Sequence, residues 1–216
     1  MKVMIYDTGI GLIPFVRKII DKKKYNEYFL YMDDDVFPIG KRSKEFIINH
    51  LNYIINYAKN KFDILILACN SLSSYLKYLD LSKTNLKIYS IFEENTKLID
   101  EDTTFICTSA SSRNIAITNV ICLDDLPNLI ENSNVKEIIK EIGNMEIHTK
   151  KAILGCTHFP FIDFIFKDIK KDVVFESAED VIIDKLPSTN VLSLKGNKKA
   201  TKYLLNYLKK SNKILC

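Results

Sequence analysis

The chain has 216 residues, of which 47% are hydrophobic and 27% are charged. This is the balance of an ordinary soluble globular protein, and it excludes a disordered chain, a collagen-like repeat and a disulfide-rich miniprotein. The net charge is +4, from 31 basic against 27 acidic residues, and only three of the basic residues are arginines. Such a small excess, nearly without the arginine fork that reads bases and phosphates, does not predict a nucleic-acid partner.

The N-terminal residues lack the charged, apolar and small-residue order of a signal peptide. No stretch approaches 18 uncharged apolar residues, so we expect no membrane span. The five cysteines are an odd number without a CxxC pair, which is typical of free thiols in a reducing compartment. We therefore expect a cytoplasmic protein.

The first half of the chain alternates short apolar runs with longer amphipathic ones. Strands are predicted over 2–6, 27–32 and 64–68, and helices over 13–23 and 43–60. Ser43 caps the second of these helices. Continuous apolar runs are typical of parallel strands covered on both faces, so the order indicates an α/β fold.

The second half of the chain predicts a further series of the same kind. Strands are predicted over 104–107, 117–122, 152–155 and 173–175, and helices over 135–142, 161–167 and 198–210. The polar segment 93–102 is the expected crossover between two lobes. The first lobe is then expected to contain 1–95 and 172–216, and the second 96–171.

Two segments of the chain resemble each other. In 63–71 and in 151–158 an apolar strand ends in a small residue, followed by Cys69 or Cys156 and a hydrogen-bonding residue. Ligands of open α/β sheets bind at such strand ends. We therefore predict two pseudo-twofold related lobes, each a mostly parallel sheet flanked by helices, with the active site in the cleft between them.

Two opposed thiols suit the inversion of a stereocentre beside a carboxylate. One thiolate removes the Cα proton from one face, and the other thiol delivers a proton to the opposite face. Polar segments that follow other strands supply supporting groups: 7–9 (D-T-G), 38–40 (P-I-G) and 108–112 (T-S-A-S-S). Their hydroxyls and backbone N–H groups are suited to a carboxylate. Asp7 is placed either to accept a hydrogen bond from the ammonium group of the substrate or to tune the thiol of Cys69, and His158 is placed to tune Cys156.

Seven short motifs follow one another along the chain: D-T-G-I-G at 7–11, P-I-G-K-R-S at 38–43, A-C-N-S at 68–71, T-S-A-S at 108–111, L-P-N-L-I-E at 126–131, L-G-C-T-H-F-P at 154–160 and E-S-A at 176–178. Together they resemble the cofactor-independent glutamate racemases of the aspartate/glutamate racemase superfamily. The resemblance covers nearly the whole chain, and 154–160 is its most specific motif.

The resemblance implies a role for each matching residue. Cys69 and Cys156 are implied as the two acid/base thiols. Asp7 and His158 are implied to assist them, with Glu131 as a further supporting acid. The implied substrate-binding residues are Asp7, Thr8, Pro38, Ile39, Gly40, Asn70, Ser71, Ser111, Thr157 and His158.

The implied reaction is the interconversion of L- and D-glutamate, with no pyridoxal phosphate or other cofactor and no metal. Its product, D-glutamate, would supply peptidoglycan synthesis, and so cell-wall biogenesis and cell shape. The implied partner is a small-molecule substrate, the amino acid glutamate, and neither a nucleic acid nor a membrane is implied. Because family members often form dimers, a homodimer is compatible with the resemblance.

Some residues depart from the family pattern and leave alternatives open. Ile39 stands where the family has tyrosine, and Leu72 where it has a small alanine. Both can reshape the pocket, so a racemase of aspartate or another amino acid is one alternative. A non-catalytic binding protein on the same fold is a second. A redox dithiol protein is a third, which requires Cα atoms of the two cysteines within about 7 Å.

Other chemically suggestive residues are predicted to be structural. Buried free cysteine is most often inert, and this is the expectation for Cys107, Cys122 and Cys216. His50 and His148 are expected to have structural roles. The aspartate run 33–35 is expected to be a loop, because three consecutive side chains diverge and no partner ligands are evident.

Overall fold

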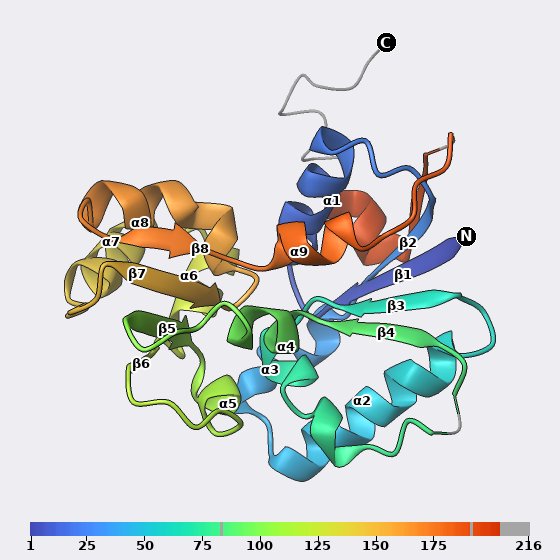
Figure 1. The fold of residues 1–216 in the computed structure, drawn as a ribbon, viewed down its shortest axis with the longest axis horizontal. Coiled ribbons are helices and arrows are strands. Elements are labelled where there is room, and N and C mark those ends of the chain that lie inside the picture. The colour runs from blue at the N-terminus through green and yellow to red at the C-terminus, as the bar shows by residue number, and fades with distance from the viewer. Residues whose placement is uncertain (83, 191, 204–216) are drawn as a thin grey trace.

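Two parallel β-sheets, each covered by helices, make up the computed structural model of the chain (Figure 1). The structure describes residues 1–82, 84–190 and 192–203. One sheet is built mainly from the N-terminal part of the chain and the other from the middle part. The predicted α/β class is therefore confirmed.

The first sheet has five strands in the order β4-β3-β1-β2-β9. They are β1 (Lys2–Asp7), β2 (Glu27–Met32), β3 (Ile64–Leu67), β4 (Lys87–Ser90) and β9 (Ser193–Gly196). Every ladder between them is parallel. The strand β1 lies at the centre and is fully buried from Val3 to Asp7, so the end of this strand delivers Asp7 into the interior.

Helices cover both faces of the first sheet because the side chains of its strands alternate in direction. Val3 and Ile5 of β1 pack on the face of α1 (Leu12–Asp21) and α9 (Glu179–Asp184). Met4 and Tyr6 pack on the opposite face, against α2 (Lys44–Ala58). Ser43 caps α2, as predicted, by accepting a hydrogen bond from the Phe46 N–H.

The second sheet has four parallel strands in the order β6-β5-β7-β8. They are β5 (Thr103–Cys107), β6 (Val120–Cys122), β7 (Lys151–Gly155) and β8 (Val174–Glu176). One face is covered by α6 (Leu126–Glu131), α7 (Val135–Gly143) and α8 (Asp163–Ile169). On the other face Phe92 of α4 (Ile91–Thr96) packs against Phe105 and Ile153.

The two sheets share one strand order. The first four strands are arranged β4-β3-β1-β2, and the next four are arranged β8-β7-β5-β6. Each of the first four strands therefore has a counterpart four strands further along the chain, whereas β9 is an additional strand of the first sheet. In this correspondence β3, which precedes Cys69, matches β7, which precedes Cys156. The equivalence of the two cysteine segments in the sequence thus has a structural basis.

The predicted boundary at residue 172 needs a correction. The strand predicted over 173–175 was expected in the first lobe, but β8 pairs with β7 of the second sheet. Its ladder places the return to the first lobe after Glu176, at residues 177–178. Of the helix predicted over 198–210, residues 198–203 are helical, whereas 204–210 and Cys216 lie outside the described residues.

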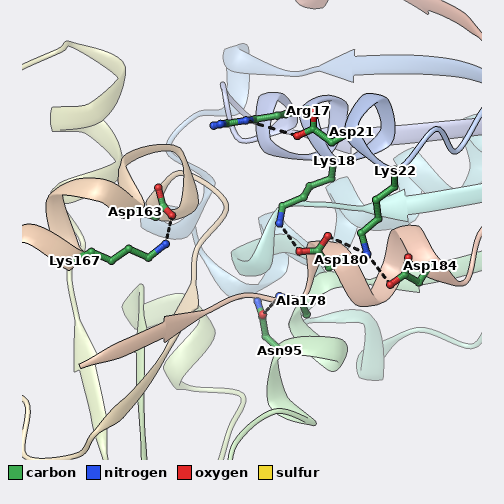
Figure 2. A network of polar contacts seen from close by, with 10 residues as sticks. All are labelled: Arg17, Lys18, Asp21, Lys22, Asn95, Asp163, Lys167, Ala178, Asp180 and Asp184. Carbon is green, nitrogen blue, oxygen red and sulfur yellow. Dashed lines mark hydrogen bonds and ion pairs between the residues drawn. The ribbon is translucent and has the colours of Figure 1, made fainter. Parts of the chain in front are cut away.

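The return crossing is fixed to the first lobe by ion pairs between α9 and α1. Lys18 pairs with Asp180, and Lys22 contacts both Asp180 at 3.1 Å and Asp184 at 2.7 Å (Figure 2). These partly exposed ion pairs link α9 to the C-terminal part of α1 and to Lys22, which follows it. Within the described part of the chain, no helix is long and apolar enough to cross a membrane.

Candidate active site

A small pocket lies between the two lobes, at the carboxyl ends of their central strands. Its cavity volume is about 30 Å³. From the first lobe it is lined by Thr8, Phe37, Pro38, Ile39, Gly40, Lys41, Cys69, Asn70 and Ser71, and from the second by Thr108, Asp124, Pro127, Cys156, Thr157 and His158. Both predicted thiols therefore face one cavity. Each is a free cysteine and nearly fully buried, with 6% of Cys69 and 7% of Cys156 exposed.

The first-lobe side of the pocket is built on β1 and β3. Asp7 is the last residue of β1 and Thr8 follows it, and Cys69 comes shortly after the end of the neighbouring strand β3. The Thr8 Oγ1 lies 3.6 Å from the Cys69 Sγ, within hydrogen-bond distance for sulfur. The short helix α3 (Asn70–Ser73) begins immediately after Cys69 and turns Asn70 and Ser71 into the cavity.

The second-lobe side is built on the end of β7. The Cys156 Sγ lies 3.9 Å from the His158 Nδ1, and the other ring nitrogen, Nε2, lies 2.8 Å from the Glu131 Oε1. Glu131 also accepts a hydrogen bond of 2.8 Å from the Ile10 N–H of the first lobe. Thr157 donates its hydroxyl hydrogen to the Asp7 Oδ2 across the lobe boundary, at 2.8 Å.

Two glycines of the N-terminal motif allow this network to close. A Cβ on Gly9 would collide with the Glu131 Oε1 and lie 2.7 Å from the His158 Nε2. A Cβ on Gly11 would collide with the Thr157 hydroxyl and lie 2.7 Å from the Asp7 Oδ2. The pattern D-T-G-I-G is thus explained by close approach of the backbone to the second lobe.

Charge is distributed unequally between the two thiols. Burial raises the pKa of Asp7 to about 6, against the opposing effects of His158 and of hydrogen bonds from Thr157 and Gly9. Asp7 is therefore mostly ionised at neutral pH. Burial is the main cause that raises the pKa of the Cys69 thiol well above its usual range, and the Asp7 carboxylate raises it further. Cys69 is consequently a neutral thiol in this arrangement.

The other thiol has a cation as its neighbour. Burial by itself lowers the pKa of His158, but hydrogen bonds with Cys156 and Glu131, and the nearby Cys156 and Asp7, outweigh it. The result is a pKa of about 10, so His158 is protonated at neutral pH. A thiolate at Cys156 would therefore be paired with an imidazolium.

Hydroxyls and an amide line another part of the cavity wall. The Ser71 and Thr108 hydroxyls are 2.8 Å apart across the lobe boundary, and Thr108 lies 3.5 Å from the Ser111 hydroxyl. The Asn70 Nδ2 is buried and has no hydrogen-bond partner among the residues that the structure describes. Gly40 approaches the same group, since a Cβ there would lie 3.2 Å from the Ser71 Oγ. These groups can donate hydrogen bonds without adding net charge.

Most predicted site residues line the cavity, and the other three contact residues that line it. Asp7, Ser111 and Glu131 do not line it, but contact the lining residues Thr157, Thr108 and His158 respectively. Of the two departures from the family pattern, Ile39 lines the cavity. Leu72 does not, because it is fully buried in the core beside α2, so the prediction that it reshapes the pocket is wrong.

Several lining residues were missed from the sequence: Phe37, Lys41, Thr108, Asp124 and Pro127. Phe37 packs on His158, with the two ring centroids 5.3 Å apart. Thr108 belongs to the segment 108–112, whose hydroxyls the sequence already indicated. Among the other candidates, His50 is held by Tyr6 and Asp33, and Asp34 and Asp35 pair with Lys199. No cluster of potential metal ligands occurs within residues 1–82, 84–190 and 192–203.

The two α/β lobes give this chain a fold that matches solved glutamate and aspartate racemases. No protein-family model matches the chain. Its similarity to individual proteins is nevertheless extensive. It is 26% identical to a curated glutamate racemase of Buchnera aphidicola subsp. Schizaphis graminum, over 96% of this chain and 95% of that protein.

Solved structures agree with this likeness. The glutamate racemase of Campylobacter jejuni superposes with a TM-score of 0.79 at 18% identity, covering all of both chains. The Escherichia coli glutamate racemase, solved with L-glutamate and the activator UDP-MurNAc-Ala, gives 0.72 at 17% identity over 97% of this chain and 94% of that one. The resemblance to glutamate racemases predicted from the motifs is therefore confirmed, and so is the two-lobed fold.

Proposed function

We propose that this chain is an amino-acid racemase that interconverts L- and D-glutamate by proton transfer between two thiols. The observation that carries the proposal is the placement of Cys69 and Cys156, one on each lobe, at equivalent strand ends of a single buried pocket. The extended likeness to glutamate racemases supports the enzyme class and the substrate.

The charge arrangement supports a definite starting state. Cys156, as a thiolate beside protonated His158, takes the Cα proton from one face of the bound amino acid: the Cα–H bond breaks and an S–H bond forms. Cys69, as a neutral thiol, delivers its own proton to the opposite face: its S–H bond breaks and a new Cα–H bond forms. The product is the mirror image, and the negative charge has moved from Cys156 to Cys69. The opposite enantiomer reacts from that state in the reverse sense.

Neutral hydrogen-bond donors stabilise the carbanion in the proposed reaction. The Cα proton of an amino acid is very weakly acidic, so negative charge that develops on the carboxylate must meet fixed hydrogen-bond donors. Asn70, Ser71 and Thr108 present such groups in the cavity. A cavity of about 30 Å³ is far too small for glutamate, so we expect the lobes to part for entry and to close around the substrate.

The biological use of the product belongs to the same proposal. D-Glutamate would supply peptidoglycan synthesis, as the family resemblance implies. Neither pyridoxal phosphate nor a metal has a step in the proposed reaction, because each proton is carried by a cysteine.

Exchange of the Cα proton tests the proposal. The reduced protein is incubated in D₂O with L-glutamate, D-glutamate, L-aspartate or L-alanine, and the Cα signal is followed by NMR. We expect loss of the signal with both glutamates, with racemisation slowed by about 10²–10⁴-fold in Cys69→Ser and in Cys156→Ser. Cys122→Ser, at an exposed thiol outside the pocket, is the matched control and should react as the wild type does.

Each other outcome overturns a defined part of the proposal. Exchange with aspartate alone would retain the mechanism and replace the substrate. No exchange with any amino acid, from a folded and reduced protein, would favour a binding protein on the same fold. Full activity in either serine variant would exclude the two-thiol mechanism.

A further inference from the structure

Asn95 connects the pocket to both crossings between the lobes. It is fully buried near the end of α4, where the chain leaves the first lobe. Its Oδ1 accepts a hydrogen bond of 2.9 Å from the backbone N–H of Ala178, at the return crossing between β8 and α9 (Figure 2). Its Nδ2 donates to the Asn70 Oδ1 at 3.1 Å. Asn95 itself does not line the pocket.

This chain of hydrogen bonds has a fixed polarity. A backbone N–H can only donate, so it requires the oxygen of the Asn95 amide and turns the NH₂ group of that amide toward Asn70. The NH₂ group in turn requires the Asn70 oxygen. If either amide were reversed, two donors or two acceptors would face each other inside the core, where such a mismatch is costly. Ala178 therefore determines which way Asn70 points.

The consequence appears in the cavity. With its oxygen held by Asn95, Asn70 has only its NH₂ group to offer elsewhere, and the Nδ2 atom is buried without a partner among the described residues. A buried donor without a partner is unfavourable, so its presence in a pocket indicates an acceptor that arrives with the ligand. In the reaction proposed above, that acceptor is a carboxylate oxygen of the substrate.

We propose that Asn95 is a positioning residue for the racemisation: it holds Asn70 as a hydrogen-bond donor to the substrate carboxylate. The inference rests on the proposed function and deepens it. It also ties substrate binding to the crossings, because the same amide that orients Asn70 is anchored on the segment through which the chain returns to the first lobe.

The near-isosteric substitution Asn95→Asp tests the polarity. At pH 8.5 an ionised carboxylate still accepts from the Ala178 N–H but cannot donate to Asn70. Asn70 then turns its NH₂ group toward the carboxylate and its oxygen toward the pocket, where it repels the substrate. We expect the KM for both glutamate enantiomers to rise by about 10–100-fold, the range for losing a hydrogen bond to a charged group, with a smaller change in kcat.

Two further variants separate positioning from mere destabilisation. Asn95→Ala removes the constraint and leaves Asn70 free to rotate, so its KM should lie between those of the wild type and Asn95→Asp. Asn114→Asp is the matched control. Asn114 also accepts through Oδ1, from Tyr78, and donates through Nδ2 to Ser74 in the other lobe, but it lies outside the pocket. We expect the KM of this variant to stay within about twofold of the wild type, because Asn114 and its partners Tyr78 and Ser74 all lie outside the pocket.

A spectroscopic measurement checks the same inference without turnover. In protein labelled with ¹⁵N-asparagine, the side-chain NH₂ signal of Asn70, assigned by its loss in Asn70→Ser, should shift on adding D-glutamate. The shift should be absent from Asn95→Asp. An unchanged KM and an unchanged shift in Asn95→Asp would overturn the inference, as would an Asn95→Ala variant impaired more in KM than Asn95→Asp. A wild type that neither binds nor exchanges glutamate would instead overturn the proposed function.

Discussion

Cys69 and Cys156 occupy equivalent positions in two lobes of the same strand order, yet their charge environments are opposite. Cys69 lies beside the Asp7 carboxylate, and Cys156 beside the protonated His158. Their exposure is nearly the same. The comparison teaches that the fold gives the two thiols equivalent positions and similar burial, whereas their charged neighbours make their electrostatic environments different.

The comparison is sharpened most by chemical labelling. Only thiolates react with iodoacetamide at a useful rate, and the pKa of Cys69 is raised far above its usual range. At pH 8 we expect Cys156 to be alkylated faster than Cys69, because the raised pKa of Cys69 keeps that thiol protonated. Peptide mass spectrometry over time measures both rates. Equal rates at two equally buried cysteines would contradict the charge asymmetry.

The substitution Asp7→Asn removes the negative charge beside Cys69 in the first lobe. The pKa of Asp7 is about 6 in the folded protein, above the value of 3.8 for a free side chain. The folded state therefore holds more protons between these values, and the contribution of Asp7 to stability falls as the pH rises from about 4 to 6. Removing the charge should raise the free energy of unfolding by up to about 3 kcal/mol above pH 6.

Urea unfolding of wild type and Asp7→Asn at pH 4.5 and pH 8 measures this effect. The gain should be present at pH 8 and shrink toward pH 4.5. A variant that is less stable at pH 8 would show that the hydrogen bonds from Thr157 and Gly9 outweigh the burial of the charge.

The substitution His158→Gln removes the positive charge beside Cys156 in the second lobe. The glutamine can still bind Glu131 but carries no positive charge, so a thiolate at Cys156 loses its counterion. We expect kcat/KM to fall by about 10–100-fold, the range for a lost charge-assisted hydrogen bond. The alkylation rates of the two cysteines should also move closer together. Retention of full activity together with the wild-type labelling ratio would exclude His158 as the source of the asymmetry.

The smallest effect is expected from Glu131→Gln. The amide oxygen can keep the hydrogen bond from the Ile10 N–H, but the negative charge that helps to hold the proton on His158 is lost. The pKa of His158 should fall below about 10, and kcat/KM should decrease by about three- to tenfold, most clearly at high pH. The pH profile of kcat/KM measures it. A profile identical to that of the wild type would leave Glu131 with a purely structural role.

The central strands and both thiols could be predicted from the sequence because their signals are local. The run 64–68 is continuously apolar, and the cysteine that follows it repeats the pattern before Cys156. The strands β4 and β9 were missed because they are short edge strands with partly exposed, polar residues. The lobe of β8 was misassigned because membership in a sheet depends on pairing with β7, which the local sequence does not encode.

Residues that act through tertiary contacts were the hardest to predict. Asn95 lies in a polar stretch that was interpreted only as a crossover, and its role depends on Asn70 and Ala178, far away along the chain. Leu72 illustrates the opposite error. Its neighbours in the motif face the pocket, but the turn of α3 directs its side chain into the core.

Three of the hydrogen bonds around the pocket cross the boundary between the lobes: Thr157 to Asp7, Ile10 to Glu131, and Ser71 to Thr108. If the lobes part to exchange product for substrate, these three bonds break, whereas the contacts of His158 with Cys156 and Glu131 lie within the second lobe and remain. Enclosure of the substrate and completion of the pocket would then be a single event. An open molecule would keep each thiol beside the charged neighbour of its own lobe and would lose only the groups that the other lobe contributes to the pocket.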